Sequence, residues 1–422
     1  MKTRIALFAA AAALTVGLAP AMAQQATLGA GDIPPSRPGD APPPRVGSSM
    51  TRNLPKQDEA HLPKELYVLP PVSHSYAPKK TAWGDPDLRG MWPIDAIGGL
   101  SIQRTPEQGK RVWLTDQEYK VISDNMAKFR GAAAAETKAN RLGMGNWVEM
   151  TGAGRRTSML IDPDNGRLPE LTEYGKKMEA LGRSSWVRGQ TFDWVTDFDS
   201  WDRCITRGFP ASMLPFRYNN GVQILQSPGY VVINLEMIHD ARIIPLDGRG
   251  APPKAVTSWM GESRGHWEGN TLVVETTNIR PGAAPLNAAT IGGPQPAWNT
   301  VPMSPEAKVV ERFTLINPNT LTYEMTYSDP KVWTAPFTLR VDWPRNQKYE
   351  FYEYACHEGD EQVRNYIVAN RSLRAKIAAG EAKPGDALGS APSPANPNGE
   401  QPPAPRPEAS AQPAGAQQQA RR

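Results

Sequence analysis

The residues best suited to chemistry stand together in one apolar run near the middle of the chain. Residues 236–242 (EMIHDAR) contain Glu236, His239, Asp240 and Arg242. A charge inside a strand costs free energy unless it is paired or used. In a regular strand the two carboxylates share one face and His239 points to the other, whereas a bulge would bring Glu236 and His239 together. A histidine beside a carboxylate can act as a general base, but a salt bridge to Arg242 would explain the same residues structurally.

A second candidate for acid or base chemistry is His357, which directly follows one of the two cysteines of the chain. In an exported protein, an even pair such as Cys204 and Cys356 suggests a disulfide. A free thiol at each site, or one nucleophilic cysteine, is the alternative. The bridge would bring His357 close to residues 202–207. Arg264 stands in a third polar group, where it could orient the other residues or form a surface ion pair.

Residues 186–202 are unusually rich in aromatic side chains, with acidic residues between them. Aromatic rings interleaved with carboxylates suit a sugar-like or polycyclic ligand, although the same rings could equally pin a loop to the sheet. The predicted substrate-binding residues are Trp186, Trp194, Trp201, Tyr218, Asn219 and Arg264.

Short β-strands must position most of these residues. Strand-like runs separated by turns continue from residue 221 to residue 355, including a long strand or bent pair at 230–245 and a last strand at 349–355. Gly269 and Asn270 form a strong two-residue hairpin signal. The pattern predicts a mainly β fold with flanking helices (α+β), built as an antiparallel barrel or sandwich.

Helical patterns flank these strands on both sides. The first begins at a capping box formed by Thr115 and Glu118, and two further helices are expected at residues 171–181 and 363–377.

The first 23 residues have the parts of a bacterial signal peptide. A basic start, an apolar run from Ile5 to Leu18 and a small-residue box at 21–23 follow one another in that order. A membrane anchor is the weaker alternative, because a span needs about 20 apolar residues. We therefore expect a protein of the periplasm or the secreted fraction, without a membrane span.

The remaining chain divides by composition into three parts. Residues 24–78 and 381–422 are rich in proline and small or polar residues, so we expect disordered or extended segments there. Residues 79–380 are expected to form a single β-rich domain with a helical N-terminal part. A net charge of +4 without a long basic run argues against nucleic acid as a partner. A small-molecule ligand is the expected partner, and the oligomeric state stays open.

Several familiar catalytic motifs are missing from the sequence. There is no HExxH or H-x-H pair for a metal, no nucleophile elbow, and no P-loop or dinucleotide fingerprint. We therefore expect neither a metal site nor a cofactor, which leaves acid/base chemistry as the simplest enzymatic option.

The chain resembles a widespread, uncharacterised family of exported bacterial proteins. The resemblance covers residues 83–369 and rests on the motifs EMIHDAR, GESRG, WEGNTLVVETTN and YACHEG. It implies export but no particular reaction. The family pattern leads us to expect arginine at position 266, where this chain has His266, so the resemblance does not support that residue as catalytic. The strands at 266–343 are also similar to the strand repeat of lipocalin-like barrels, at the level of fold only.

Two functions fit these observations. The first is an exported catabolic lyase, isomerase or hydrolase acting on a small cyclic, aromatic or sugar-like substrate. In it, Glu236 or His239 would be the base, His357 a second acid or base, and Arg242 or Arg264 the electrophilic stabiliser. The alternative is a non-catalytic periplasmic protein that binds an apolar small ligand.

Overall fold

A computed structural model describes residues 54–94, 96–98, 100–139, 150–181, 192–198, 200–216, 218–280, 302–359 and 361–383. The chain divides into two units between residues 39 and 40, and everything described lies in the second. The expected signal peptide at residues 1–23, nearly all of the expected tail at 381–422, and Trp186 lie outside the described residues.

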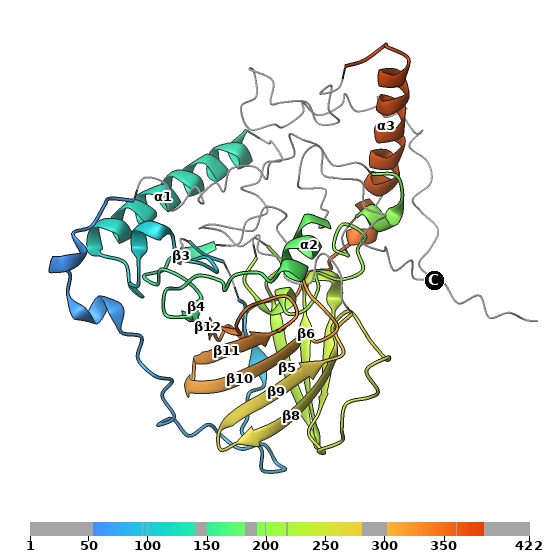
Figure 1. Cartoon of the computed structure of the whole chain (residues 1–422). Coiled ribbons are helices and arrows are strands. Elements are labelled where there is room, and N and C mark those ends of the chain that lie inside the picture. The colour runs from blue at the N-terminus through green and yellow to red at the C-terminus, as the bar shows by residue number, and fades with distance from the viewer. Residues whose placement is uncertain are drawn as a thin grey trace, which may run out of the picture. The chain divides into compact units, whose positions relative to one another are not determined.

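Two antiparallel sheets form the centre of the fold (Figure 1). The first has the order β1-β5-β6-β7 and the second the order β4-β12-β11-β10-β9-β8. The strands of the first sheet are β1 (Gly90–Met91), β5 (Val222–Ser227), β6 (Tyr230–Leu235) and β7 (Ala241–Pro245). Those of the second are β4 (Leu160–Asp162), β12 (Phe337–Pro344), β11 (Thr320–Ser328), β10 (Lys308–Asn317), β9 (Thr271–Thr277) and β8 (Glu262–Glu268). A separate parallel pair joins β2 (Ala96–Gly98) to β3 (Met150–Ala153).

This topology confirms the expected mainly β fold with flanking helices. Among the described residues the strands form open sheets and not a closed barrel, which agrees with the sandwich alternative. The predicted hairpin at Gly269 is also confirmed, because Glu268 pairs with Thr271 across it. The run at 230–245 is a bent pair, with β6 and β7 on either side of a tight turn.

One apolar core packs residues from both sheets together. On β10, Val309 and Phe313 are fully buried and alternate with partly exposed neighbours, as expected for a strand with one face on the core. At Gly265 on β8, an added Cβ would lie only 2.9 Å from the Cγ2 atom of Ile244 on β7. A residue without a side chain therefore allows the edge strands β7 and β8 to approach each other closely.

Within the residues that the structure describes, the sheets are accompanied by the helices α1 (Asp116–Lys138), α2 (Glu173–Leu181) and α3 (Glu361–Ala378). The predicted capping box is present, because the Glu118 carboxylate accepts from the Thr115 N–H at 2.9 Å and the Thr115 hydroxyl accepts from the Glu118 N–H at 3.2 Å. Ile122 and Met126 are buried on one face of α1, as its spacing predicts. In the part of the chain that the structure describes, no helix is both long and apolar enough to span a membrane.

The prediction of a strand at residues 349–355 is wrong. This segment has no strand partner, and the backbone N–H of Tyr352 donates instead to the buried carboxylate of Glu236 at 3.0 Å. A side chain thus takes the place of a neighbouring strand as the acceptor at this position.

Candidate functional site

The predicted centre of the site, residues 236–242, consists of a tight 3-10 turn after β6 and the first two residues of β7. The turn η7 (Met237–His239) holds Ile238 at φ 57° and His239 at φ 44°. This left-handed region is strongly disfavoured for a β-branched residue such as Ile238. Such residues persist only where surrounding contacts fix them, and they gather at functional sites. The turn is neither the regular strand nor the bulge considered from the sequence, and it sends its polar side chains to different surroundings.

The carboxylate of Glu236 is buried and accepts four hydrogen bonds. Its donors are the Asn219 side chain (3.1 Å), the Tyr352 N–H (3.0 Å), the Gly221 N–H (2.9 Å) and the Tyr349 hydroxyl (2.6 Å). An ionised carboxylate offers about four acceptor positions, so these donors occupy them all. Glu236 therefore fastens η7 to residues 219–221 and 349–352, and it has no free lone pair with which to act as a base.

The two predicted histidines and Asp240 do not join Glu236. His239 and His357 are both exposed. Asp240 is half-buried, and its carboxylate accepts from the Thr206 hydroxyl at 2.6 Å. Burial raises the pKa of Asp240, and the Thr206 hydrogen bond and the charge of His239 act in the opposite direction. The acid/base group that the sequence suggested is therefore divided among separate environments.

Arg242 lies in the core, between the two sheets. Its guanidinium pairs with the Glu311 carboxylate at 2.9 and 2.5 Å, and it also donates to the hydroxyls of Ser263 (3.1 Å) and Thr276 (3.2 Å). The Tyr323 hydroxyl donates to the same carboxylate at 2.9 Å. With both charged groups essentially inaccessible to solvent, Arg242 joins β7 to β10 and has no open face for a substrate.

The predicted disulfide between Cys204 and Cys356 is confirmed. Beside it, the Trp201 indole N–H donates to the Tyr354 hydroxyl at 3.2 Å. Trp201 also belongs to a buried cluster with Met237 and Ile238 of η7. The bridge thus lies beside a cluster in which Trp201, Phe216 and Tyr354 pack against the η7 turn.

The other predicted ligand-binding residues have varied positions. Tyr218 packs edge-on against Phe216 in the same cluster, with ring centroids 5.1 Å apart. Trp194 is 63% exposed, and Asn219 holds Glu236. Arg264 donates to the Ser263 carbonyl at 2.7 Å and to the Gly250 carbonyl at 3.2 Å. These residues therefore differ widely in their exposure and in their hydrogen-bond partners.

One buried cation near the η7 turn, Arg207, was not predicted from the sequence. Arg207 is 3% exposed, and its Nη1 donates to the Leu214 carbonyl at 2.7 Å. Its Nε and Nη2 have no hydrogen-bond partner among the residues that the structure describes. Burial lowers the pKa of Arg207 to about 9, so the guanidinium stays charged at neutral pH. A cavity of about 10 Å³ is lined by Arg207, Asn219 and Glu236 among others. An arginine in a loop carries no sequence signal of such burial.

A larger hollow, which we call the Arg104 hollow, lies elsewhere in the fold. It measures about 350 Å³ and is lined by Tyr67, Leu69, Arg104, Lys110, Val112, Ile161 and Asp164. Arg104 is 1% exposed, and its Nε donates to the Thr157 hydroxyl at 3.1 Å while its Nη1 donates to the Asp164 carbonyl at 2.6 Å. Lys110 forms an exposed ion pair with the Asp164 carboxylate at 2.7 Å.

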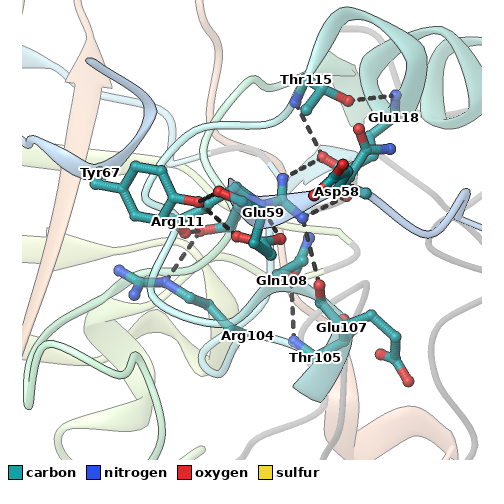
Figure 2. A network of polar contacts seen from close by, with 12 residues as sticks. Asp58, Glu59, Tyr67, Arg104, Thr105, Glu107, Gln108, Arg111, Thr115 and Glu118 are labelled. Atoms are coloured by element: carbon teal, nitrogen blue, oxygen red, sulfur yellow. Dashed lines mark hydrogen bonds and ion pairs between the residues drawn. The ribbon is translucent and has the colours of Figure 1, made fainter. Parts of the chain in front are cut away.

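A polar network fixes one wall of this hollow (Figure 2). The buried Arg111 pairs with Glu118 at 2.5 and 2.8 Å and with Glu59 at 2.8 Å. The Tyr67 hydroxyl donates to Glu59 at 2.6 Å, and burial, followed by this hydrogen bond, raises the pKa of Tyr67. Figure 2 shows the Arg104 guanidinium on the side of Tyr67, away from Glu118. The ring of Tyr67 is therefore held in place before any ligand arrives.

Comparisons with known proteins add no relative. No protein-family model, curated protein or solved structure matches the chain. Within the described residues, no group of three or more histidine, cysteine or acidic side chains is arranged to hold a metal ion.

Proposed function

We propose that the protein binds a small organic anion in the Arg104 hollow and does not transform it. The observation that carries this proposal is the buried guanidinium of Arg104 in a hollow of about 350 Å³ whose lining is partly apolar. Small-molecule sites have volumes of about 300–1,000 Å³, mostly apolar linings and a few fixed polar groups. The hollow has the volume and the fixed polar groups of such a site, and apolar side chains form part of its lining.

Charge and shape together suggest the class of ligand. Two cations, Arg104 and Lys110, and one carboxylate, Asp164, line the hollow, which leaves one positive charge in excess. An acidic group on the ligand would compensate this charge and accept hydrogen bonds from Arg104 and Lys110. Leu69, Val112 and the Tyr67 ring offer apolar surface for the rest of the ligand. A small cyclic carboxylate matches both parts.

The titratable groups around the hollow support binding without catalysis. Tyr67 has a raised pKa, and its hydroxyl already donates to Glu59. The ion pair with Lys110 lowers the pKa of Asp164. Both shifts move the pKa values of these groups further from neutral pH, whereas a general acid or base works best with a pKa near the operating pH.

Export is part of the same proposal. The expected signal peptide, the resemblance to exported bacterial proteins and the disulfide all support a protein that works outside the reducing cytoplasm. A binding protein in the periplasm or the secreted fraction would meet its ligand there.

The proposal is tested by calorimetry with a panel of small cyclic and aliphatic monocarboxylates, benzoate and cyclohexanecarboxylate among them. Arg104→Met and Lys110→Met should each weaken binding, the former by at least about tenfold, because hydrogen bonds to charged groups contribute about 1.5–3 kcal/mol. Lys120→Met is the matched control for Lys110→Met, since Lys120 is also an exposed lysine paired with an aspartate, at 2.8 Å. Binding that Arg104→Met leaves unchanged would place the ligand elsewhere.

Acid/base catalysis at Asp240 is a second candidate, favoured by the raised pKa of that half-buried carboxyl beside His239. In a turnover screen of small cyclic substrates, Asp240→Asn would then abolish activity while leaving binding in the Arg104 hollow intact. Turnover that persists in this variant would exclude Asp240 as the catalytic group.

A further inference from the structure

One wall of the Arg104 hollow is attached more weakly than the rest of its lining. Tyr67 and Leu69 come from residues 54–70, which we call the N-terminal strap, and the other lining residues come from the body of the fold. None of the strap residues is buried, whereas Val112 and Arg104 in the body are 8% and 1% exposed. A segment with few buried contacts opens locally at a much smaller cost in free energy than unfolding of the whole chain.

Hydrogen bonds donated by the body attach the strap. The Leu66 carbonyl accepts from the backbone N–H groups of Val112 at 2.8 Å and Trp113 at 3.0 Å. The Trp113 indole N–H donates to the Val68 carbonyl at 2.9 Å. Water can replace the partner of each of these groups when the strap separates from the body, so each bond contributes only its small net value to the attachment.

One ion pair completes the attachment, and it can break without leaving a buried charge alone. Glu59 of the strap accepts from Arg111 Nε at 2.8 Å, and the Tyr67 hydroxyl donates to the same carboxylate from within the strap (Figure 2). Arg111 also pairs with the buried Glu118 of the body at 2.5 and 2.8 Å. Loss of Glu59 therefore leaves Arg111 with a counter-charge, which avoids the large penalty of an uncompensated buried ion. The Glu59 side chain is already 43% exposed, and Tyr67 would move away with it.

The burial of Arg104 gives the opening of this strap a function. Since Arg104 is 1% exposed, an acidic ligand reaches its guanidinium only when a neighbouring wall moves, and Figure 2 shows this guanidinium on the side of Tyr67. We infer that the N-terminal strap is a hinged wall of the Arg104 hollow, which opens to admit the ligand and closes over it with Tyr67 and Leu69. A ligand that contacts these two side chains only in the closed state shifts the strap toward closure. The inference rests on the proposed function, but opening of the strap is measurable without a ligand.

Amide hydrogen exchange of the full-length chain, resolved to single residues, tests this inference. The N–H groups of Val112 and Trp113 donate to the strap, whereas those of their neighbours Arg111 and Leu114 donate to carbonyls of the body at 3.0 and 2.8 Å. Without ligand, and after correction for intrinsic rates, the amides of Val112 and Trp113 should exchange at least about tenfold faster than those of Arg111 and Leu114, because opening of the strap exposes only the first pair. Equal exchange of all four amides would overturn the inference.

Benzoate should slow the exchange of the strap-dependent amides alone. At about ten times the Kd measured by calorimetry, a ligand that binds only the closed state lowers the exchange rates of Val112 and Trp113 about tenfold. Unchanged rates at this concentration would show that the strap is not coupled to the ligand. If calorimetry detects no binding of any carboxylate, the proposed function fails by that result, while the exchange without ligand still decides whether the strap opens.

Glu59→Gln tests the ion pair of the strap. This change keeps the size of the side chain and an acceptor for Tyr67 but removes the charge that pairs with Arg111, so exchange of Val112 and Trp113 should rise about threefold. In stopped-flow fluorescence, benzoate should both associate and dissociate about threefold faster with an unchanged Kd, because the free and bound closed states lose the same ion pair.

Glu65→Gln is the matched control, since Glu65 is an exposed carboxylate of the same strap. It should leave the exchange rates and the binding kinetics as in the wild type. A Glu59→Gln variant with wild-type exchange, or with a changed Kd and unchanged rates, would contradict the part assigned to the Glu59–Arg111 pair in holding the strap closed.

Discussion

Replacing Arg242 with methionine should destabilise the fold strongly. The substitution removes both hydrogen bonds between Arg242 and Glu311 as well as those to Ser263 and Thr276, and it leaves the Glu311 carboxylate fully buried with only the Tyr323 hydroxyl as a donor. Removing one partner of a buried ion pair costs about 3–5 kcal/mol, because the other charge stays buried without compensation. We expect a loss of that size in the free energy of unfolding, measured by denaturant titration with tryptophan fluorescence.

The double variant Arg242→Met/Glu311→Leu makes this prediction sharper. With both charges gone, the remaining penalty is the unpartnered Tyr323 hydroxyl, about 1–2 kcal/mol, so the double variant should be more stable than Arg242→Met alone. Glu311→Leu alone, which leaves Arg242 buried without its carboxylate, completes the double-mutant cycle, and we expect a favourable coupling energy of at least about 2 kcal/mol from it. A single variant that loses less than about 1 kcal/mol, or a cycle without coupling, would refute the core role assigned to Arg242.

Three further predictions concern the η7 turn and the residues packed around it. Replacing Cys204 and Cys356 with serine should cost about 5 kcal/mol by the chain-entropy relation, given the sequence separation of 152, and thermal unfolding with and without reductant checks this. Burial raises the pKa of Asp240, so the contribution of this carboxyl to stability is complete below the ordinary carboxyl pKa and is lost as the pH rises through the raised value. Asp240→Asn should therefore be more stable than the wild type at pH 7. This advantage should vanish below about pH 4 in a pH series of denaturant titrations. Glu236→Gln should cost about 2–3 kcal/mol and Tyr349→Phe about 1–2 kcal/mol in the same assay, and equal stability of all three proteins would contradict the anchoring role of this carboxylate.

Local signals in the sequence accounted for much of the fold. The hairpin at Gly269, the capping box at Thr115 and the two flanking helices that follow it depend on neighbouring residues, and each was predicted close to its observed position. The prediction of a strand at 349–355 failed: the segment has no strand partner, and the N–H of Tyr352 donates to a buried carboxylate from elsewhere in the chain. Alternating or apolar residues alone cannot reveal such a long-range acceptor.

The candidate site was harder to predict than the fold, because the direction of a side chain depends on backbone geometry that cannot be read from the sequence. Because Ile238 and His239 adopt left-handed conformations, the side chains of Glu236, Asp240 and Arg242 point in different directions. They contact the Gly221 backbone, the Thr206 hydroxyl and the Glu311 carboxylate, respectively. The pairing of Cys204 with Cys356 was predictable, since the chain offers no other partner. Burial of Arg104 and Arg207, in contrast, follows from tertiary packing and had no recognisable pattern.

The most direct test of the proposed function compares benzoate with uncharged benzamide in calorimetric titrations of the wild type and Arg104→Met. If the buried guanidinium recognises the acidic group of a ligand in the Arg104 hollow, the variant should lose at least about tenfold in affinity for benzoate and bind benzamide as the wild type does. Equal affinities of both proteins for benzoate, or no binding of any carboxylate by the wild type, would contradict the account.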